Sequence, residues 1–208
     1  RVPGDVTGPD TTVAAAPPAD ATDPGPEVTT AALEEEATNR RGLFSIADTP
    51  SGPRGTLPFG EVAKVCEFRT SDLGQEVATS DSRPRFKLYD TQPDSIEPRT
   101  QFLTGFRDGC ARQFTASLAL FGTAQVHETT RYNPLNTNPY SATDEAYEKV
   151  KMRVCRVKHG AFCPDRPAKR LNRDTVFLSV YRDFGGTGTW MEMFLHRGRL
   201  VSFGTLGG

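Results

Sequence analysis

The histidines of the chain are the first place to look for acid–base or nucleophilic chemistry, because imidazole titrates near neutral pH. There are three of them, His127, His159 and His196. Ser179 or Ser202, combined with His196 and an acid, would make a nucleophile–base pair of the kind that hydrolases use. The sequence holds no GxSxG, SxxK or Cys–His signature to support such a pair. We therefore expect no catalytic residues and keep a hydrolase as the alternative.

Metal and phosphate chemistry find little support in the sequence. Met191, Met193 and His196 offer soft ligands, but on a strand the two methionines share one face and His196 points to the other. The glycine-rich run 185–188 lacks the GK[ST] of a phosphate loop and is expected to be a hairpin turn. We expect neither a metal nor a cofactor. Residues 126–140 are expected to form a polar loop of the size that often carries function.

Basic side chains gather between residues 149 and 173, where the only acid is Asp165. A solvated surface is one interpretation. The other is a binding surface for an acidic protein partner, anionic headgroups, polyanionic cell-wall material or the acidic N-terminal segment of this chain. Nucleic acid is not expected, because no aromatic platform accompanies the charge. The residues predicted to bind a partner are Lys158, Arg166, Lys169, Arg170 and Arg173.

The four cysteines bear on the compartment. They are Cys66, Cys110, Cys155 and Cys163, with no CxxC spacing and no histidine placed for a zinc finger. Four cysteines allow three pairings. We favour Cys155–Cys163, closing the loop that leaves a helix, and Cys66–Cys110, tying an early segment to a hairpin turn. Two disulfides predict an oxidising compartment, and four reduced, buried cysteines in a cytosolic protein are the alternative.

The N-terminal part of the chain differs in charge and composition from the rest. Residues 1–40 hold eight acids and two bases, leaving 18 acids and 23 bases for the remaining residues. Residues 1–30 are mostly Pro, Ala, Thr and Gly, with too little apolar surface to offset the entropy of folding. We expect residues 1–55 to be an extended acidic linker with a short helix at 30–41. It is either a passive tether or a strap that becomes ordered on a partner.

Periodicity predicts strands around one main helix in residues 56–208. Ser141 is the expected N-cap of that helix, and the spacing of Ala142, Ala146, Val150 and Val154 predicts a core-facing stripe that leaves Lys151 outside. The segment 61–68 fits a strand or a short helix. Alternating patterns predict strands at 85–90, 100–106, 111–121, 174–183, 190–196 and 200–203, with a hairpin over 100–121. The expected fold is α+β, an antiparallel sheet in the order β-β-β-α-β-β.

Several short runs resemble uncharacterised exported proteins of alphaproteobacteria. The similarity covers roughly residues 60–208. The runs are Tyr132-Asn133-Pro134-Leu135, Pro139-Tyr140-Ser141, Asp144, Ala146-Tyr147-Glu148, Arg153-Val154-Cys155, Cys163, Thr175-Val176-Phe177 and Val180-Tyr181. The resemblance implies an exported protein and supplies no catalytic residues.

Together these patterns predict a non-enzymatic periplasmic binding protein of the cell envelope, an accessory subunit of a larger membrane complex. No run approaches the ~18 apolar residues of a membrane span. A lipid or membrane anchor upstream of Arg1 is a further hypothesis, since Pro/Ala/Thr linkers join such anchors to periplasmic domains. A protein partner in the envelope is expected, and the oligomeric state stays open. The alternative is a small periplasmic hydrolase acting on cell-wall or lipid material.

Overall fold

The computed structural model describes residues 46–51, 55–185 and 188–206, with side chains from residue 55 onward. The expected linker covers residues 1–55, and its residues 1–45, with the expected helix at 30–41, lie outside the described part of the chain. The first described strand, Ile46–Ser51, pairs in parallel with Val62–Val65. The main sheet therefore starts before residue 56, where proline and glycine had indicated the boundary.

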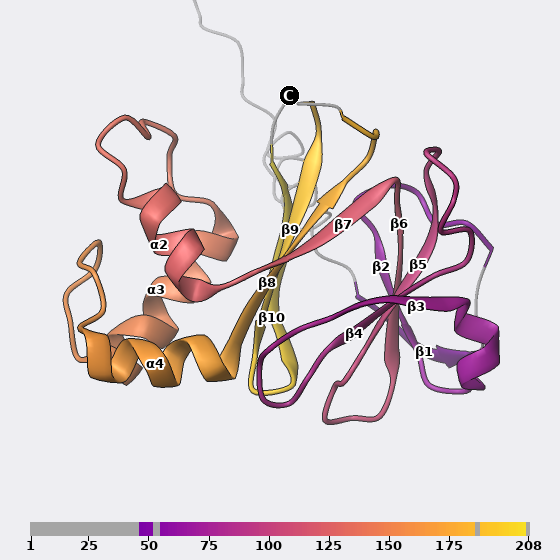
Figure 1. Cartoon of the computed structure of the whole chain (residues 1–208), viewed down its shortest axis with the longest axis horizontal. Helices are drawn as coiled ribbons and strands as arrows, with labels where there is room; N and C mark the ends of the chain where they lie inside the picture. Colours follow the sequence, from indigo (N-terminus) through magenta and orange to yellow (C-terminus); the bar gives the residue numbers. More distant parts are fainter. Residues whose placement is uncertain (1–45, 52–54, 186–187, 207–208) are drawn as a thin grey trace, which may run out of the picture. The chain divides into compact units, whose positions relative to one another are not determined.

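The described residues form two sheets, three α-helices and one 3-10 helix (Figure 1). The larger sheet has the strand order β1-β2-β6-β5-β4-β3 and the smaller one β10-β9-β8-β7, and all pairs except β1–β2 are antiparallel. The bounds are β1 Ile46–Ser51, β2 Val62–Val65, η1 Thr70–Leu73, β3 Gln75–Thr79, β4 Lys87–Asp90, β5 Arg99–Thr104, β6 Ala111–Ala116, β7 Leu118–Gly122, α2 Ala124–Arg131, α3 Ala142–Cys155, α4 Asp165–Asp174, β8 Thr175–Tyr181, β9 Trp190–His196 and β10 Arg199–Leu206.

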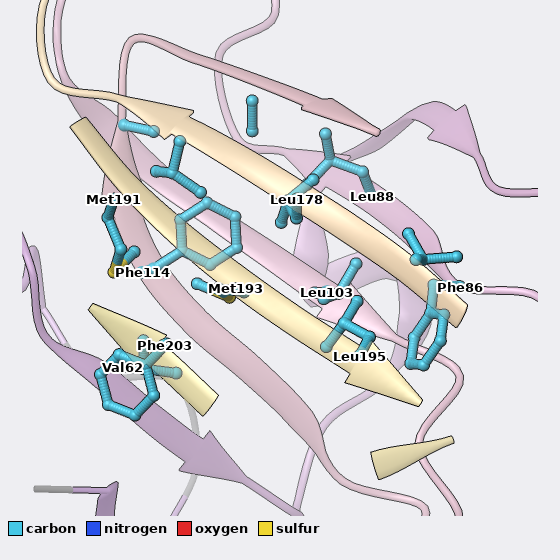
Figure 2. Packing of buried hydrophobic residues seen from close by; sticks show 14 of the residues in the cluster. Val62, Phe86, Leu88, Leu103, Phe114, Leu178, Met191, Met193, Leu195 and Phe203 are labelled. Atoms are coloured by element: carbon cyan, nitrogen blue, oxygen red, sulfur yellow. The ribbon is translucent and has the colours of Figure 1, made fainter. Parts of the chain in front are cut away.

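One face of the smaller sheet packs on the larger sheet to make the main hydrophobic core (Figure 2). Alternation along β9 sends Met191, Met193 and Leu195 into this core, where all three are fully buried. Phe114 and Leu103 meet them from the larger sheet. This apolar core fixes β8 and β9 through the side chains of one face only. The side chains of their opposite face contact other parts of the domain.

That other face of the smaller sheet is covered by α2, α3 and α4 (Figure 1). Phe177 of β8 and Phe194 of β9 meet Tyr147 of α3 there, in a second cluster of buried residues. Helix α3 begins as expected, with a capping box in which Ser141 Oγ accepts from the N–H of Asp144 and the Asp144 carboxylate accepts from the N–H of Ser141. The helices and this face together enclose two clusters of polar side chains and a pocket.

The α+β class and the main antiparallel pairings are confirmed, but the simple order with one helix is wrong. Residues 124–131 form α2, where a polar loop was expected, and residues 165–174 form α4. The segment 61–68 contributes a strand, β2. The hairpin over 100–121 exists only as β5 and β6, since Ser117 interrupts the alternation and β7 joins the other sheet.

Ser117 explains that change of sheet. Its N–H donates to Tyr181 O at 3.0 Å and its Oγ to Arg182 O at 2.6 Å, while its carbonyl accepts from Arg99 at 2.8 Å. The chain turns at this residue, so Ala119 faces the core while Leu120 is exposed.

Both predicted disulfides are present: Cys66–Cys110, spanning 44 residues, and Cys155–Cys163, spanning 8. They indicate an oxidising, extracytoplasmic environment. Among the described residues, no helix is long and apolar enough to cross a membrane.

Candidate functional site: a polar pocket beside a closed polar cluster

Helix α2 supplies side chains to two different polar clusters. It begins at Thr123, whose hydroxyl accepts from the N–H of Val126 at 3.2 Å. One turn later, the neighbours His127 and Glu128 point in directions about 100° apart, as consecutive helical residues must. His127 and Arg131 lie on one side of the helix, Glu128 and Tyr132 on the other. Two polar clusters therefore take their residues from two different faces of this eight-residue helix and its C-cap, Tyr132.

The closed cluster consists of Glu128, Tyr132, Tyr147, Glu148 and Lys151. Lys151 is fully buried at 0% exposure and pairs with the equally buried Glu148 at 2.8 Å. Lys151 also donates to the hydroxyl of Tyr132, which in turn donates to Glu148. Tyr147 donates to Glu128 at 2.6 Å. The expectation that Lys151 lies away from the core is wrong, because α3 buries Tyr147, Glu148 and Lys151. The alanine–valine stripe does pack on the same cluster of residues, but Ala146, Val150 and Val154 are only partly buried there.

Backbone donors complete the closed cluster from the loop that the Cys155–Cys163 disulfide closes. The N–H of Gly160 donates to Glu148 at 3.1 Å, and the N–H of Cys163 donates to Glu128 at 3.1 Å. Each carboxylate therefore has one side-chain and one backbone donor or more. Such full pairing is what makes buried charge tolerable in a folded domain.

The pKa values in the closed cluster follow from burial and these bonds. Burial raises the pKa of Glu148, but hydrogen bonds from Lys151, Tyr132 and the Gly160 N–H outweigh it, and the net shift is downward. Burial, followed by the hydrogen bond to Glu148, raises the pKa of Tyr132. The pKa of Tyr147 is raised for the same two reasons, with Glu128 as its partner. These groups keep one protonation state around neutral pH, which suits a structural role.

The open cluster consists of His127, Arg131, Asp144 and Glu192. The His127 ring is 8% exposed and stacks on Phe177, with centroids 4.0 Å apart. Its Nε2 lies 3.3 Å from Asp144 Oδ1 and its Nδ1 lies 3.9 Å from Glu192 Oε1. Arg131 reaches Asp144 Oδ2 at 3.7 Å. A carboxylate thus stands near each nitrogen of the imidazole, one from α3 and one from β9.

This cluster is incompletely paired. His127 Nε2 and Arg131 Nε are buried and form no hydrogen bond, since the 3.3 Å approach of Asp144 to Nε2 lacks the alignment of one. The guanidinium end of Arg131 is held, because it donates to the carbonyls of Asn138 and Pro139 at 2.6 and 3.3 Å. Buried polar groups without a partner are uncommon and call for an explanation. Both residues line a pocket.

The pocket has a volume of about 660 Å³, within the range of roughly 300–1,000 Å³ typical of small-molecule sites. Its floor is the helix-facing side of β8 and β9, and its walls are α2, the loop after α2 and the start of α3. The lining residues used below are Thr130, Asn136, Asn138, Ser179, Tyr181, Trp190 and the four residues of the open cluster. Tyr181 and Trp190 face each other across β8 and β9 with nearly parallel rings, 6.2 Å between centroids and 21° between planes.

The sequence could have indicated part of this site. His127 and Arg131 have the i, i+4 spacing of one helix face, but the helix was not expected because it has so few apolar residues. Asp144 is an acid in the first turn of a helix, where acids commonly complement the helix dipole, so its type does not indicate a pocket. Glu192 and Trp190 share the strand face opposite Met191 and Met193, yet nothing local distinguishes them from solvent-facing residues.

The hydrolase candidates of the sequence are not assembled into a nucleophile–base pair. His196 Nδ1 lies 3.0 Å from Thr175 Oγ1 rather than from a serine. Burial, followed by the charge of Arg197, lowers the pKa of His196. Ser179 lines the pocket opposite Glu192 in the strand register. His159, the remaining histidine, lies 3.5 Å from the exposed Glu145 outside the pocket.

Metal ligation has no support in the described part of the chain, where no group of three His, Cys, Asp or Glu side chains is placed to hold an ion. In the open cluster the imidazole stands between the carboxylates, so their ligating atoms do not converge. Met191 and Met193 lie in the core between the sheets, whereas the ring of His196 stacks near Phe194 on the other face, as strand geometry requires.

The predicted partner-binding residues are exposed on α4 and the loop before it. All five, Lys158, Arg166, Lys169, Arg170 and Arg173, are exposed. Arg170 donates to Val154 O at 3.0 Å and so fastens α4 to α3, whereas Arg173 pairs at 2.8 Å with Asp174, its neighbour within α4. Lys158, Arg166 and Lys169 form no ion pair with any residue that the structure describes.

Comparisons of the chain with protein-family profiles, with curated proteins and with solved structures gave no match in any of the three. Fold and site together define a disulfide-bonded α+β domain with a polar, aromatic-walled pocket. That pocket and the basic surface are the two features that bear on function.

Proposed function

We propose that this protein is a non-enzymatic binding protein of the cell envelope whose ligand occupies the pocket between α2, α3 and the smaller sheet. The observation that carries the proposal is the open cluster. Polar groups that are about nine-tenths buried, with His127 Nε2 and Arg131 Nε unpaired, lie on a pocket with an aromatic wall. Ligand sites usually combine a largely apolar pocket with a small number of polar groups that point into it.

Occupancy of the pocket is directly measurable, because Trp190 is the single tryptophan of the chain and lies in the pocket wall. Fluorescence titrations with sugars, amino acids, dicarboxylic acids and short peptides should give a saturable change with at least one class. Acrylamide quenching of Trp190 should fall at saturation. His127→Gln should weaken that change, whereas Lys158→Gln, on the exposed basic surface, should leave it unaltered. No response to any class, in protein shown to be folded and ligand-free, would contradict the proposal.

The basic surface supports a second part of the proposal, docking onto an acidic partner in a larger envelope complex. Lys158, Arg166 and Lys169 carry it, because their charges are exposed and unpaired among the described residues. The double variant Arg166→Glu/Lys169→Glu should release a partner captured from gently solubilised membranes. The matched variant Lys87→Glu/Arg85→Glu, on the larger sheet, should retain it. Loss of the partner in both would show a general charge effect instead.

A periplasmic location and membrane anchoring belong to the same proposal. The two disulfides support the compartment, and the Pro/Ala/Thr composition of residues 1–30 supports a linker to an anchor. Fractionation of cells that make the full-length protein should place it with the periplasmic or envelope fraction. Recovery in the cytosolic fraction with free thiols would contradict this part.

The alternative function is a small periplasmic hydrolase, and one observation favours it. The pocket brings His127 next to Asp144 and Glu192 and includes the hydroxyl of Ser179, which are groups used in general acid–base catalysis. Turnover of nitrophenyl esters or nitrophenyl glycosides, abolished by His127→Gln in folded protein, would establish the hydrolase. A saturable ligand that is recovered intact would favour the binding protein.

A further inference from the structure

From the chemistry of its walls we infer that the pocket takes a neutral pyranose sugar, such as one or two units of a glycan. This inference rests on the proposed function, since it names the ligand class of the same pocket. Three features of the pocket support it: the aromatic wall, the mixture of hydrogen-bond donors and acceptors, and the presence of charged side chains of both signs.

The aromatic wall suits the ring of a sugar. Tyr181 and Trp190 are half-buried side chains on adjacent strands, and both line the pocket. A pyranose has one face of C–H groups, which packs on aromatic rings, and an edge of hydroxyls that needs polar partners. Tyrosine and tryptophan serve such ligands because an apolar ring and a polar tip are combined in one side chain. A straight-chain polyol has the same hydroxyls but no ring face to pack.

Beyond the aromatic wall the pocket offers both donors and acceptors. Thr130, Asn136 and Asn138 line the side of α2 and the following loop, and Ser179 and Glu192 line the strands. Hydroxyl and amide groups can donate and accept, whereas the carboxylate only accepts. Sugar hydroxyls also do both, so they can satisfy a mixed lining. His127, which also lines the pocket, adds an imidazole to this mixed lining.

The charges in the pocket argue against strongly ionic ligands. The pocket is lined by two carboxylates, Asp144 and Glu192, and by the guanidinium of Arg131, which lies 3.7 Å from Asp144, so charges of both signs are present in the site. An anion such as phosphate would meet two carboxylates, and a polyamine would meet the guanidinium. A neutral ligand avoids both costs, since burying an unpaired charge is expensive. The extracytoplasmic environment indicated by the disulfides is also where envelope glycans are found.

Calorimetric titration of the disulfide-bonded protein with cellobiose and with N,N′-diacetylchitobiose tests this inference, and mannitol serves as the open-chain control. At least one of the two sugars should bind saturably and mannitol should not. The affinity should change less than about twofold between 50 and 500 mM NaCl, because a neutral ligand releases no counterions. Trp190→Ala should weaken binding at least about tenfold, as expected for loss of an aromatic anchor. Phe162→Leu, an exposed aromatic outside this pocket, should leave binding unchanged.

The remaining outcomes separate the two claims. If Trp190 responds to amino acids, peptides or dicarboxylic acids but neither sugar binds, the sugar inference is wrong and the binding function stands. Equal binding of mannitol, or binding that salt abolishes, also overturns the sugar inference. If no class perturbs the pocket, both claims fail. Trp190→Phe, which keeps a ring, controls for misfolding of the alanine variant and should retain most of the affinity.

Discussion

The two polar clusters under the helices both contain residues of α2 and α3, yet they differ in how completely their buried polar atoms are hydrogen-bonded. In the closed cluster, the buried Lys151 and Glu148 have hydrogen-bond partners, including a backbone N–H from the disulfide-closed loop. In the open cluster, His127 Nε2 and Arg131 Nε have none. The difference shows that burial of charged side chains does not by itself mark a functional site. Completeness of pairing is what distinguishes the closed cluster from the open one.

The contrast is sharp because so little separates the clusters. Asp144 of the open cluster lies one helical turn before Glu148 of the closed one, and His127 directly precedes Glu128. Asp144 serves both the fold and the pocket, since its Oδ2 accepts from Ser141 in the capping box while its Oδ1 faces His127. Variants that break one cluster at a time can therefore test whether their roles differ.

The largest effect is expected from Lys151→Met in the closed cluster. Methionine fills a similar volume but leaves the carboxylate of Glu148 buried without its cation, which typically costs about 3–5 kcal/mol of the free energy of unfolding. Urea denaturation followed by circular dichroism measures it. Lys149→Met, two positions away and exposed, should change stability by less than about 0.5 kcal/mol. The double variant Glu148→Gln/Lys151→Met should recover part of the loss, and no recovery would contradict the pairing argument.

A smaller loss is expected when the disulfide next to the closed cluster is removed. Cys155→Ala/Cys163→Ala opens a loop of 8 residues, for which the chain-entropy relation gives about 2.5 kcal/mol. Hydrogen exchange of the Gly160 N–H should also become faster, because that loop presents it to Glu148.

The other disulfide provides the matched control. Cys66→Ala/Cys110→Ala opens 44 residues and should cost more, about 4 kcal/mol, without a selective change at Gly160. If both double variants alter Gly160 to the same extent, the loop does not support the closed cluster in the way described.

The sequence was informative where local chemistry decides the structure. Ser141 predicted the start of α3 as its N-cap, because a cap is formed with the next few residues of the chain. The disulfide pairing followed from the position of Cys155 at the end of that helix and of Cys110 at a hairpin turn. The hairpin predicted within 100–121 also depends on local chemistry, since β5 and β6 pair on either side of Asp108–Gly109.

The sequence misled where tertiary contacts decide. Helix α2 buries only Ala124 and Glu128 fully, so it has no apolar periodicity and was taken for a loop. Lys151 was placed in solvent because its partners, Tyr132 and the Gly160 loop, come from distant parts of the chain. The open cluster joins α2, α3 and β9, so no spacing within one segment could have predicted it.

Lowering the pH should remove the contribution of the Glu148 carboxylate to the free energy of unfolding. Its pKa is lowered in the folded protein, so the stabilisation is present above the ordinary value of 4.5 and is lost as the pH falls through the folded value. The difference in unfolding free energy between the wild-type protein and Glu148→Gln should be largest above pH 5 and should narrow toward pH 3. Urea midpoints across that range measure it. The exposed Glu97→Gln is the control, and a difference that stays constant for Glu148→Gln would contradict the assignment.

The smallest effect on stability is expected in the open cluster, although the effect on binding should be complete. His127→Phe keeps a ring stacked on Phe177 and removes the unpaired Nε2, so the free energy of unfolding should stay within about 1 kcal/mol of the wild type. The response of Trp190 to any ligand of the pocket should be lost, because the hydrogen-bonding group is gone. Groups retained for binding rather than folding commonly behave in this way. If His127→Phe instead lowers the free energy of unfolding by 3 kcal/mol or more, His127 is a structural residue like Lys151. The proposed difference in role between the two clusters would then be wrong.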